Sequence, residues 1–249
     1  MSATEPSLRE LAARVLPLID LTSLGEDDTP AHIQAMCARA REHGLPAAVC
    51  VYPEHITTAR RALAGTQVRI ATVVNFPDGG SDPARVERET RRALAAGADE
   101  IDLVLPWRAL LAGDHDGARA VVAAARTACA APALLKLILE TGELAAPEQI
   151  RAAAELGIAA GVDFLKTSTG KVKVNATPAA ATILLDVIAA HGGRCGFKAA
   201  GGIRSLDDAR AYLQLARERL GEAWITPAHL RIGASALYDA LLPQLATPA

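Results

Sequence analysis

Lysine is confined to one part of this chain, whereas arginine is the usual basic residue elsewhere. The 249-residue sequence has 26 lysines and arginines, and the five lysines are Lys136, Lys166, Lys171, Lys173 and Lys198. Three of them fall in the stretch DFLKTSTGKVK (163–173). A lysine amine that loses its proton can attack a carbonyl and form a Schiff base, which an arginine cannot do. Codon usage could explain the arginine excess, but the cluster favours covalent lysine chemistry.

The elements that must position these lysines follow a regular pattern. Apolar runs that predict strands alternate with helical patterns and recur about every 30 residues, the length of a strand with its crossover helix. The runs cover residues 16–22, 47–53, 69–77, 100–106, 133–141, 163–170, 195–202 and 230–235. Eight such units predict a (β/α)8 TIM barrel over residues 16–240. The alternative, a doubly wound open sheet, would carry a GxGxxG turn after its first strand, and DLTSLGEDDT is not one.

Capping signals mark the predicted helices. Thr29-Pro30, Asp82-Pro83, Thr177-Pro178 and Ser205 each precede a helical pattern, and Gly44, Gly97, Gly192 and Gly221 follow these four patterns. Residues 6–15 predict an additional N-terminal helix within a lead-in of residues 1–15. Since no low-complexity linker interrupts the chain, we expect residues 1–249 to form a single domain.

Composition argues against several classes of partner. Aromatic residues are only 3% of the chain, and with a net charge of −2 its charges alternate in sign, so no nucleic acid or anionic membrane partner is expected. No run reaches the roughly 18 apolar residues of a membrane span, and the N-terminus lacks a signal-peptide pattern. The four cysteines form no CxxC pair, which favours a reduced, cytoplasmic protein.

The barrel places Lys166 and Lys198 near the C-terminal ends of consecutive strands, where active sites of this fold lie. A buried lysine is usually a paired structural ion, but these two cannot pair with each other. With strands about 4.8 Å apart and ammonium groups about 6 Å apart, their repulsion is about 2.8 kcal/mol at a dielectric constant of about 20, or about two pKa units. One lysine would then become the nucleophile while the other keeps its charge.

Other polar residues fall at the same end of the predicted strands. Asp102 alternates with Ile101 and Leu103, and Asp20 shares a face with Thr22. The stretches AAGGI (199–203) and RIGAS (231–235) follow strands seven and eight, where such barrels commonly bind phosphate. STGK (168–171) adds hydroxyl groups, including that of Thr169, and the charge of Lys171.

A metal site and a Ser/His/Asp triad are both disfavoured. The six histidines, at positions 32, 43, 55, 115, 191 and 229, fall in predicted helices or at their ends, and no HxH or HExxH motif occurs. We therefore expect neither metal nor cofactor.

The motifs together resemble the deoxyribose-phosphate aldolase family. They are LIDLTSL, VCVYP, VVNFPDGG, GADEIDLVLP, LKLILETGEL, DFLKTSTGK, GFKAAGGIRS and RIGAS, which cover all eight predicted strands in order over residues 16–240. The family consists of class I aldolases that interconvert 2-deoxy-D-ribose 5-phosphate with D-glyceraldehyde 3-phosphate and acetaldehyde. The resemblance therefore implies a phosphosugar and acetaldehyde as partners. Family members are commonly dimers, so it also implies a homodimer, although the exposed helices leave the oligomeric state open.

Residue roles follow from the resemblance position by position. Lys166 matches the Schiff-base lysine, Lys198 the neighbour that perturbs it, and Asp102 a proton shuttle that works through a bound water. Asp20 and Thr22 match positions around the sugar hydroxyls. The phosphate-binding positions are Gly170, Lys171, Gly201, Gly202, Gly233 and Ser235.

Three residues have more than one interpretation, and a fourth, Lys173, has no motif behind it. Cys50 matches a cysteine that borders the family's pocket, but a lone strand cysteine is more often part of the core. Lys136 either joins the polar network or holds Asp102. Glu140 lies at the mouth of strand five or caps the next turn, and Lys173 is best explained as a solvated loop charge.

The chain departs from the family pattern at two places, and two other functions are open to it. The chain ends LLPQLATPA without the terminal tyrosine of some members, and GASAL lacks the second serine that some members carry. The first alternative function is another Schiff-base aldolase or a transaldolase with a longer donor. The second is a non-catalytic phosphosugar-binding barrel, which would have lost a reactive residue, whereas Lys166, Lys198 and Asp102 are all present.

Overall fold

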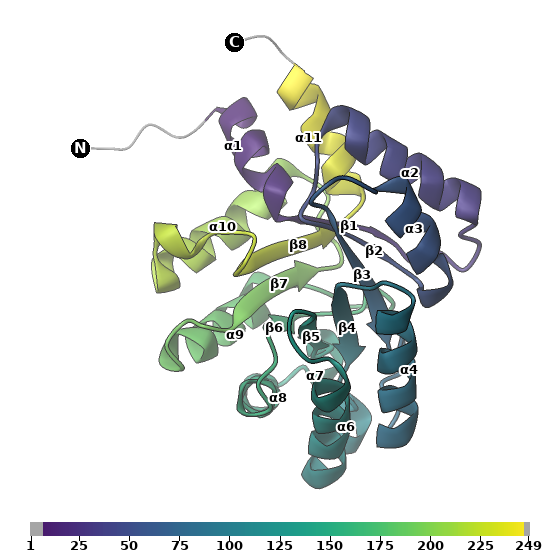
Figure 1. The fold of residues 1–249 in the computed structure, drawn as a ribbon. Coiled ribbons are helices and arrows are strands. Elements are labelled where there is room, and N and C mark those ends of the chain that lie inside the picture. The colour runs from purple at the N-terminus through teal and green to yellow at the C-terminus, as the bar shows by residue number, and fades with distance from the viewer. Residues whose placement is uncertain (1–6, 247–249) are drawn as a thin grey trace.

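Eight parallel strands form a closed barrel in chain order, surrounded by helices (Figure 1). The computed structural model describes residues 7–246. The strands are β1 (Ile19–Ser23), β2 (Ala48–Val51), β3 (Arg69–Val74), β4 (Glu100–Val104), β5 (Leu134–Ile138), β6 (Phe164–Lys166), β7 (Gly196–Ala200) and β8 (Leu230–Ala234). The predicted (β/α)8 TIM barrel is confirmed.

The helices begin and end close to the predicted capping residues. They are α1 (Leu8–Val15), α2 (Pro30–His43), α3 (Ile56–Ala62), α4 (Pro83–Ala95), α5 (Trp107–Leu111), α6 (His115–Ala128), α7 (Thr141–Leu144), α8 (Pro147–Ala159), α9 (Pro178–Ala190), α10 (Leu206–Leu220) and α11 (Ala236–Ala246). Three short 3-10 helices are η1 (Leu16–Leu18), η2 (Pro53–His55) and η3 (Glu222–Trp224). The side chains of Thr29, Asp82, Thr177 and Ser205 accept backbone N–H groups at the starts of α2, α4, α9 and α10.

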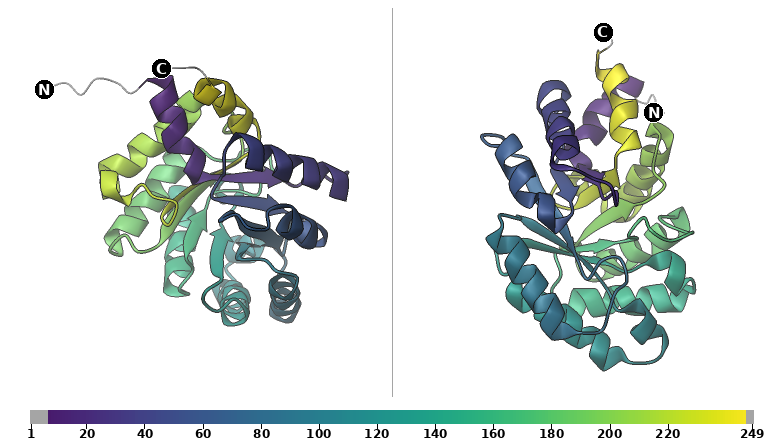
Figure 2. Two further views of the ribbon diagram at one scale, coloured as in Figure 1. Left: turned by 45° about the horizontal axis from the view of Figure 1, so that its top comes forward. Right: turned by 90° about the vertical axis from the view of Figure 1, so that its right-hand side faces the viewer.

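The predicted N-terminal helix is present as α1. A reciprocal capping box between Ser7 and Glu10 fixes its first turn. It packs against α10 and α11 in the outer layer (Figures 1 and 2). Residues 1–6 of the predicted lead-in and residues 247–249 of the C-terminal tail lie outside the described residues.

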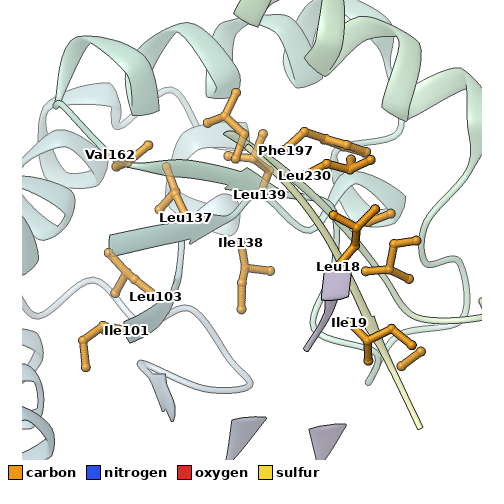
Figure 3. Packing of buried hydrophobic residues seen from close by; sticks show 14 of the residues in the cluster. Leu18, Ile19, Ile101, Leu103, Leu137, Ile138, Leu139, Val162, Phe197 and Leu230 are labelled. Carbon is orange, nitrogen blue, oxygen red and sulfur yellow. The ribbon is translucent and has the colours of Figure 1, made fainter. Parts of the chain in front are cut away.

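The two faces of the strands bury different kinds of side chain. Leu137, Phe197 and Leu230 belong to the large apolar cluster between strands and helices (Figure 3). On the barrel interior, β2 and β3 contribute a separate apolar cluster that contains Ala48, Cys50, Ala71 and Val73. The remaining interior positions carry most of the buried charge of the molecule.

Several details differ from the sequence predictions, three of them with a clear local cause. The first strand begins at Ile19 rather than residue 16, because Pro17 lies in η1 and has no N–H to donate to a strand ladder. Strand β6 ends at Lys166 rather than residue 170, because the chain turns into a loop around Gly170, whose φ is +87°. His229 lies in a turn before β8, stacked on Trp224 with ring centroids 5.4 Å apart, and not at a helix end.

Candidate active site

Lys166 and Lys198 lie side by side on the adjacent strands β6 and β7, in direct register. Their ammonium groups lie 2.7 Å and 2.8 Å from the same carboxylate oxygen, Oδ2 of Asp102. The other oxygen of Asp102 accepts a hydrogen bond from Lys136 at 2.9 Å. Asp102 thus makes direct contact with both predicted catalytic lysines.

A second layer of charge lies beneath these residues. Asp20 contacts Lys198 at 2.6 Å, Lys136 at 3.4 Å and Arg231 at 2.6 Å. Glu100 contacts Lys136 at 2.5 Å and Arg231 at 3.0 Å. These five side chains are at most 4% exposed. Strands from opposite sides of the barrel are therefore joined by one buried ionic network.

Lys166 and Lys198 occupy different places in this network and therefore differ in their affinity for a proton. Burial lowers the pKa of Lys166, and the charge of Lys198 adds to this effect against the opposing attraction of Asp102. Burial also acts on Lys198, but Asp102 and Asp20 outweigh it and raise its pKa. The direction agrees with the predicted division of roles, although burial, which the repulsion argument left out, is the first cause.

A cavity of about 300 Å³ opens at the C-terminal ends of β6, β7, β8 and β1. Its lining includes nine of the predicted residues: Thr22, Lys166, Thr169, Gly170, Lys171, Gly201, Gly202, Gly233 and Ser235. Leu24, Arg204 and Ala236 also line it and were missed. A larger cavity, of about 600 Å³, lies between η2 and α4 and contains no lysine, so it cannot support the predicted chemistry.

Three glycines of the cavity wall, Gly170, Gly201 and Gly202, have positive φ angles that other residues rarely adopt. Gly201 has φ of +88°, and a Cβ there would lie 2.7 Å from Cβ of Asn175. Across the cavity, Nζ of Lys171 donates to the carbonyl of Leu24 at 2.7 Å. Ser235 directly precedes α11, so the first turn of that helix borders the cavity. Backbone amides and a helix start of this kind favour an anion such as phosphate.

Four predicted site residues besides Asp102 lie below the cavity rather than on its wall. Asp20, Cys50, Lys136 and Lys198 are all 0% exposed. Asp20 contacts Lys198 and Arg231. Lys136 contacts Asp102 and also joins the wider network through Asp20 and Glu100, so both of its interpretations apply. Cys50 packs in the apolar cluster of β2 and β3, and burial raises the pKa of its thiol.

Sequence reasoning missed Glu100 and Arg231, and it left Glu140 undecided. Glu100 has the same parity as Asp102 in β4, and Arg231 is a charged residue within β8 with the same parity as Gly233, so the alternation rule could have found both. Glu140 follows β5 with φ of +56°, and its carboxylate accepts the N–H of Thr169 at 3.2 Å and the O–H at 2.5 Å.

Within residues 7–246 there is no group of three or more His, Cys, Asp or Glu side chains that could hold a metal ion. No helix in this range is long and apolar enough to cross a membrane.

A TIM barrel with a lysine of lowered pKa at its C-terminal mouth, beside a second lysine and a shared carboxylate, defines a class I aldolase. This class works through a lysine Schiff base. A model of the DeoC/LacD family aldolases matches residues 14–241. The chain belongs to this family.

Named relatives agree with this assignment. The chain is 51% identical to deoxyribose-phosphate aldolase of Agrobacterium fabrum over 240 residues, which is 96% of this chain and 93% of the relative. It is similar to a solved structure from Coccidioides immitis assigned to the same enzyme, with a TM-score of 0.82, 30% identity, and coverage of 96% and 87% of the two chains. The tetrameric deoxyribose-phosphate aldolase of Aeropyrum pernix has a TM-score of 0.75, 25% identity, and coverage of 94% and 91%.

Proposed function

We propose that this chain reversibly cleaves 2-deoxy-D-ribose 5-phosphate to D-glyceraldehyde 3-phosphate and acetaldehyde, with Lys166 as the Schiff-base lysine. One observation carries the assignment of Lys166. It contacts the buried carboxylate Asp102 and also lines the cavity, whereas Lys136 and Lys198 are sealed below it. The 51% identity to a named deoxyribose-phosphate aldolase supports the choice of substrate.

The reaction follows from the chemistry of an amine and an aldehyde. The unprotonated amine of Lys166 attacks C1 of the open-chain sugar, and loss of water gives an iminium ion. The C3 hydroxyl gives up its proton, the bond between C2 and C3 breaks, and its electron pair moves towards the iminium nitrogen to form an enamine. Glyceraldehyde 3-phosphate leaves, C2 takes up a proton, and hydrolysis releases acetaldehyde and Lys166.

Asp102 and Lys198 support these proton transfers in the proposal. Oδ2 of Asp102 lies 2.7 Å from Nζ of Lys166 and can exchange protons with the carbinolamine and the imine. Lys198 shares this oxygen, and its retained charge disfavours a second charge on Lys166. The phosphate would bind the amides around Gly170, Gly201 and Gly233, with the charge of Lys171 beside them.

The proposal extends to assembly and location. We infer a homodimer from the resemblance, while the relative from Aeropyrum pernix is a tetramer, and light scattering of the purified chain separates these states. A phosphorylated sugar substrate and four free cysteines support a cytoplasmic location.

Borohydride trapping with acetaldehyde tests the proposed chemistry. Reduction of the Schiff base should add one ethyl group to Lys166, detected by intact mass and peptide mapping. Lys166→Arg should abolish both the adduct and turnover, whereas Lys173→Arg, which changes an exposed lysine, should leave both unchanged.

The other outcomes would change either the roles of the two lysines or the assigned function. An adduct on Lys198 would reverse the roles of the two lysines. Turnover of a longer donor, without acetaldehyde release from the deoxyribose phosphate, would indicate a different Schiff-base aldolase. A folded chain that binds the phosphosugar without any adduct would be a non-catalytic barrel.

A further inference from the structure

The buried ionic network has one cation more than it has carboxylates. Its side chains are at most 4% exposed and comprise three carboxylates and four basic groups: Asp20, Glu100 and Asp102, with Lys136, Lys166, Lys198 and Arg231. A surplus charge in a buried site is strongly disfavoured. The interior therefore becomes neutral when one of the four basic groups is unprotonated.

The contacts indicate which group that is. Lys136 contacts all three carboxylates, and Lys198 contacts Asp20 and Asp102. Lys166 contacts only Asp102, whose oxygen it shares with Lys198. Lys166 is thus the cation with the weakest hold on its proton, in agreement with its lowered pKa.

Arg231 occupies the base of this network in a fixed position. Its guanidinium donates to Asp20 and Glu100, its Nε donates to the carbonyl of Pro227, and it lies 5.6 Å from the centre of the Phe164 ring. Arginine cannot give up its proton at physiological pH, and Asp20 and Glu100 raise its pKa further against the effect of burial. Arg231 therefore supplies a permanent charge that the lysines cannot replace.

We propose that Arg231 and Glu100 are positioning residues that determine which buried lysine gives up its proton, by fixing the net charge of the barrel interior. Neither residue lines the active-site cavity, so both act through Asp20, Lys136 and Asp102. The proposal rests on the proposed role of Lys166 and adds the residues that set its charge state.

Other groups around Lys166 do not supply this balance. Cys50 faces it from β2, and burial raises the pKa of that thiol. Glu140 lies in the turn after β5, where both of its carboxylate oxygens accept hydrogen bonds from Thr169, and among residues 7–246 it forms no ion pair with a basic group of the network. The interior of β3 contributes the apolar residues Ala71 and Val73. Arg69 reaches Glu100 at 3.7 Å, but its side chain is 46% exposed, so water screens its charge.

The two residues have opposite expected effects. Arg231→Gln removes a positive charge, which makes the protonated form of Lys166 less unfavourable and raises its titration midpoint. Glu100→Gln removes a negative charge and lowers that midpoint. Each shift is on the order of one pH unit, the size expected for one unit charge in a partly screened interior. The double variant restores the balance and should titrate close to the unchanged protein, and Arg231→Lys should shift the midpoint less than Arg231→Gln.

Lysine-selective ¹⁵N labelling makes these midpoints measurable, because the chain has only five lysines. The Nζ signals of the full-length protein are followed over pH, and Lys166→Arg assigns the signal of interest. The acid limb of the pH profile of kcat/KM should move with the same sign. A purely structural role would lower the amount of active protein and leave both midpoints in place.

The titration midpoints of the three variants support or overturn the proposal. Shifts of opposite sign, cancelled in the double variant, support it. Midpoints in folded variants that stay fixed or move in one direction overturn it. If one single variant does not fold, the titration midpoints of the other single variant and of the double variant decide the proposal. If none of the three variants folds, Arg231 and Glu100 have a structural role and the proposal is overturned. An unchanged midpoint with the acetaldehyde adduct on Lys166 refutes only this inference, whereas an absent adduct in the unchanged chain refutes the proposed function.

Discussion

Asp102 accepts hydrogen bonds from three lysines, and this sharing explains why the three differ in their hold on a proton. Lys136 has Glu100 and Asp20 as further partners, and Lys198 has Asp20. Lys166 has no second carboxylate among its ion pairs within residues 7–246. The proposed nucleophile, Lys166, therefore differs from the other two lysines by having a single carboxylate partner.

Lys198→Leu should move the rate profile to higher pH. Removal of its charge raises the pKa of Lys166, and it also leaves Oδ2 of Asp102 to Lys166 alone. We expect kcat/KM at pH 7 to fall roughly tenfold or more, with recovery at alkaline pH. Lys173→Leu, which removes an exposed charge, serves as the control. Unchanged kinetics of Lys198→Leu at pH 7 would show that Lys198 does not control Lys166.

Glu140→Gln tests the turn that follows β5. The carboxylate orders the loop after β6, where the phosphate is proposed to bind, by accepting both polar hydrogens of Thr169, and the amide of glutamine can replace only one acceptor. Loss of one buried hydrogen bond costs about 1 kcal/mol, so KM for the phosphorylated substrate should rise about fivefold with kcat nearly unchanged. Glu143→Gln, on the exposed side of α7, provides the matched control. A fall in kcat at unchanged KM would instead give Glu140 a part in proton transfer.

At the scale of elements, local signals could be predicted and cross-barrel partners could not. Ser205 caps α10 through a backbone N–H three residues away, so the signal and its partner are adjacent in the sequence. Glu100 and Arg231 are 131 residues apart and meet only because the closed barrel brings the interior faces of β4 and β8 together. The alternation of side chains along a strand can predict that a charged side chain points into the barrel. It cannot predict which side chain of another strand will be its ion-pair partner.

The loops proposed to bind the phosphate provide a prediction at this scale. Gly201→Ala places a Cβ 2.7 Å from Asn175 in a backbone conformation with φ of +88°. Loop displacement should raise KM for deoxyribose 5-phosphate about tenfold, given a cost of about 1–2 kcal/mol for this conformation. Activity on unphosphorylated deoxyribose should change much less. Gly221→Ala has φ of +85° and open space around it, so it imposes similar strain away from the cavity. Equal loss on both sugars would mean that Gly201 does not serve the phosphate.

At the scale of the molecule, the barrel interior is divided between small apolar residues on β2 and β3 and ionic residues on the other strands. The apolar part follows the usual rule for a packed interior. The ionic part places the charges that the proposed chemistry requires at a cost in desolvation. Stability and activity therefore depend on the same buried groups.

This dependence predicts a steep loss of stability in acid. The lysines, together with Arg231 for Asp20, hold the pKa values of Asp20 and Asp102 well below their ordinary values against the opposing effect of burial. A carboxylate with a depressed folded-state pKa stabilises the protein above its unfolded-state pKa, and this contribution is lost as pH falls. Between pH 5 and pH 3 each should lose about 1.3 kcal/mol, or about 2.6 kcal/mol for the pair. Urea unfolding across this range measures the loss, and Asp20→Asn combined with Arg231→Gln, which removes one charge of each sign, should reduce it by about half. A free energy of unfolding that stays constant from pH 5 to pH 3 would contradict the ionic network that joins these strands.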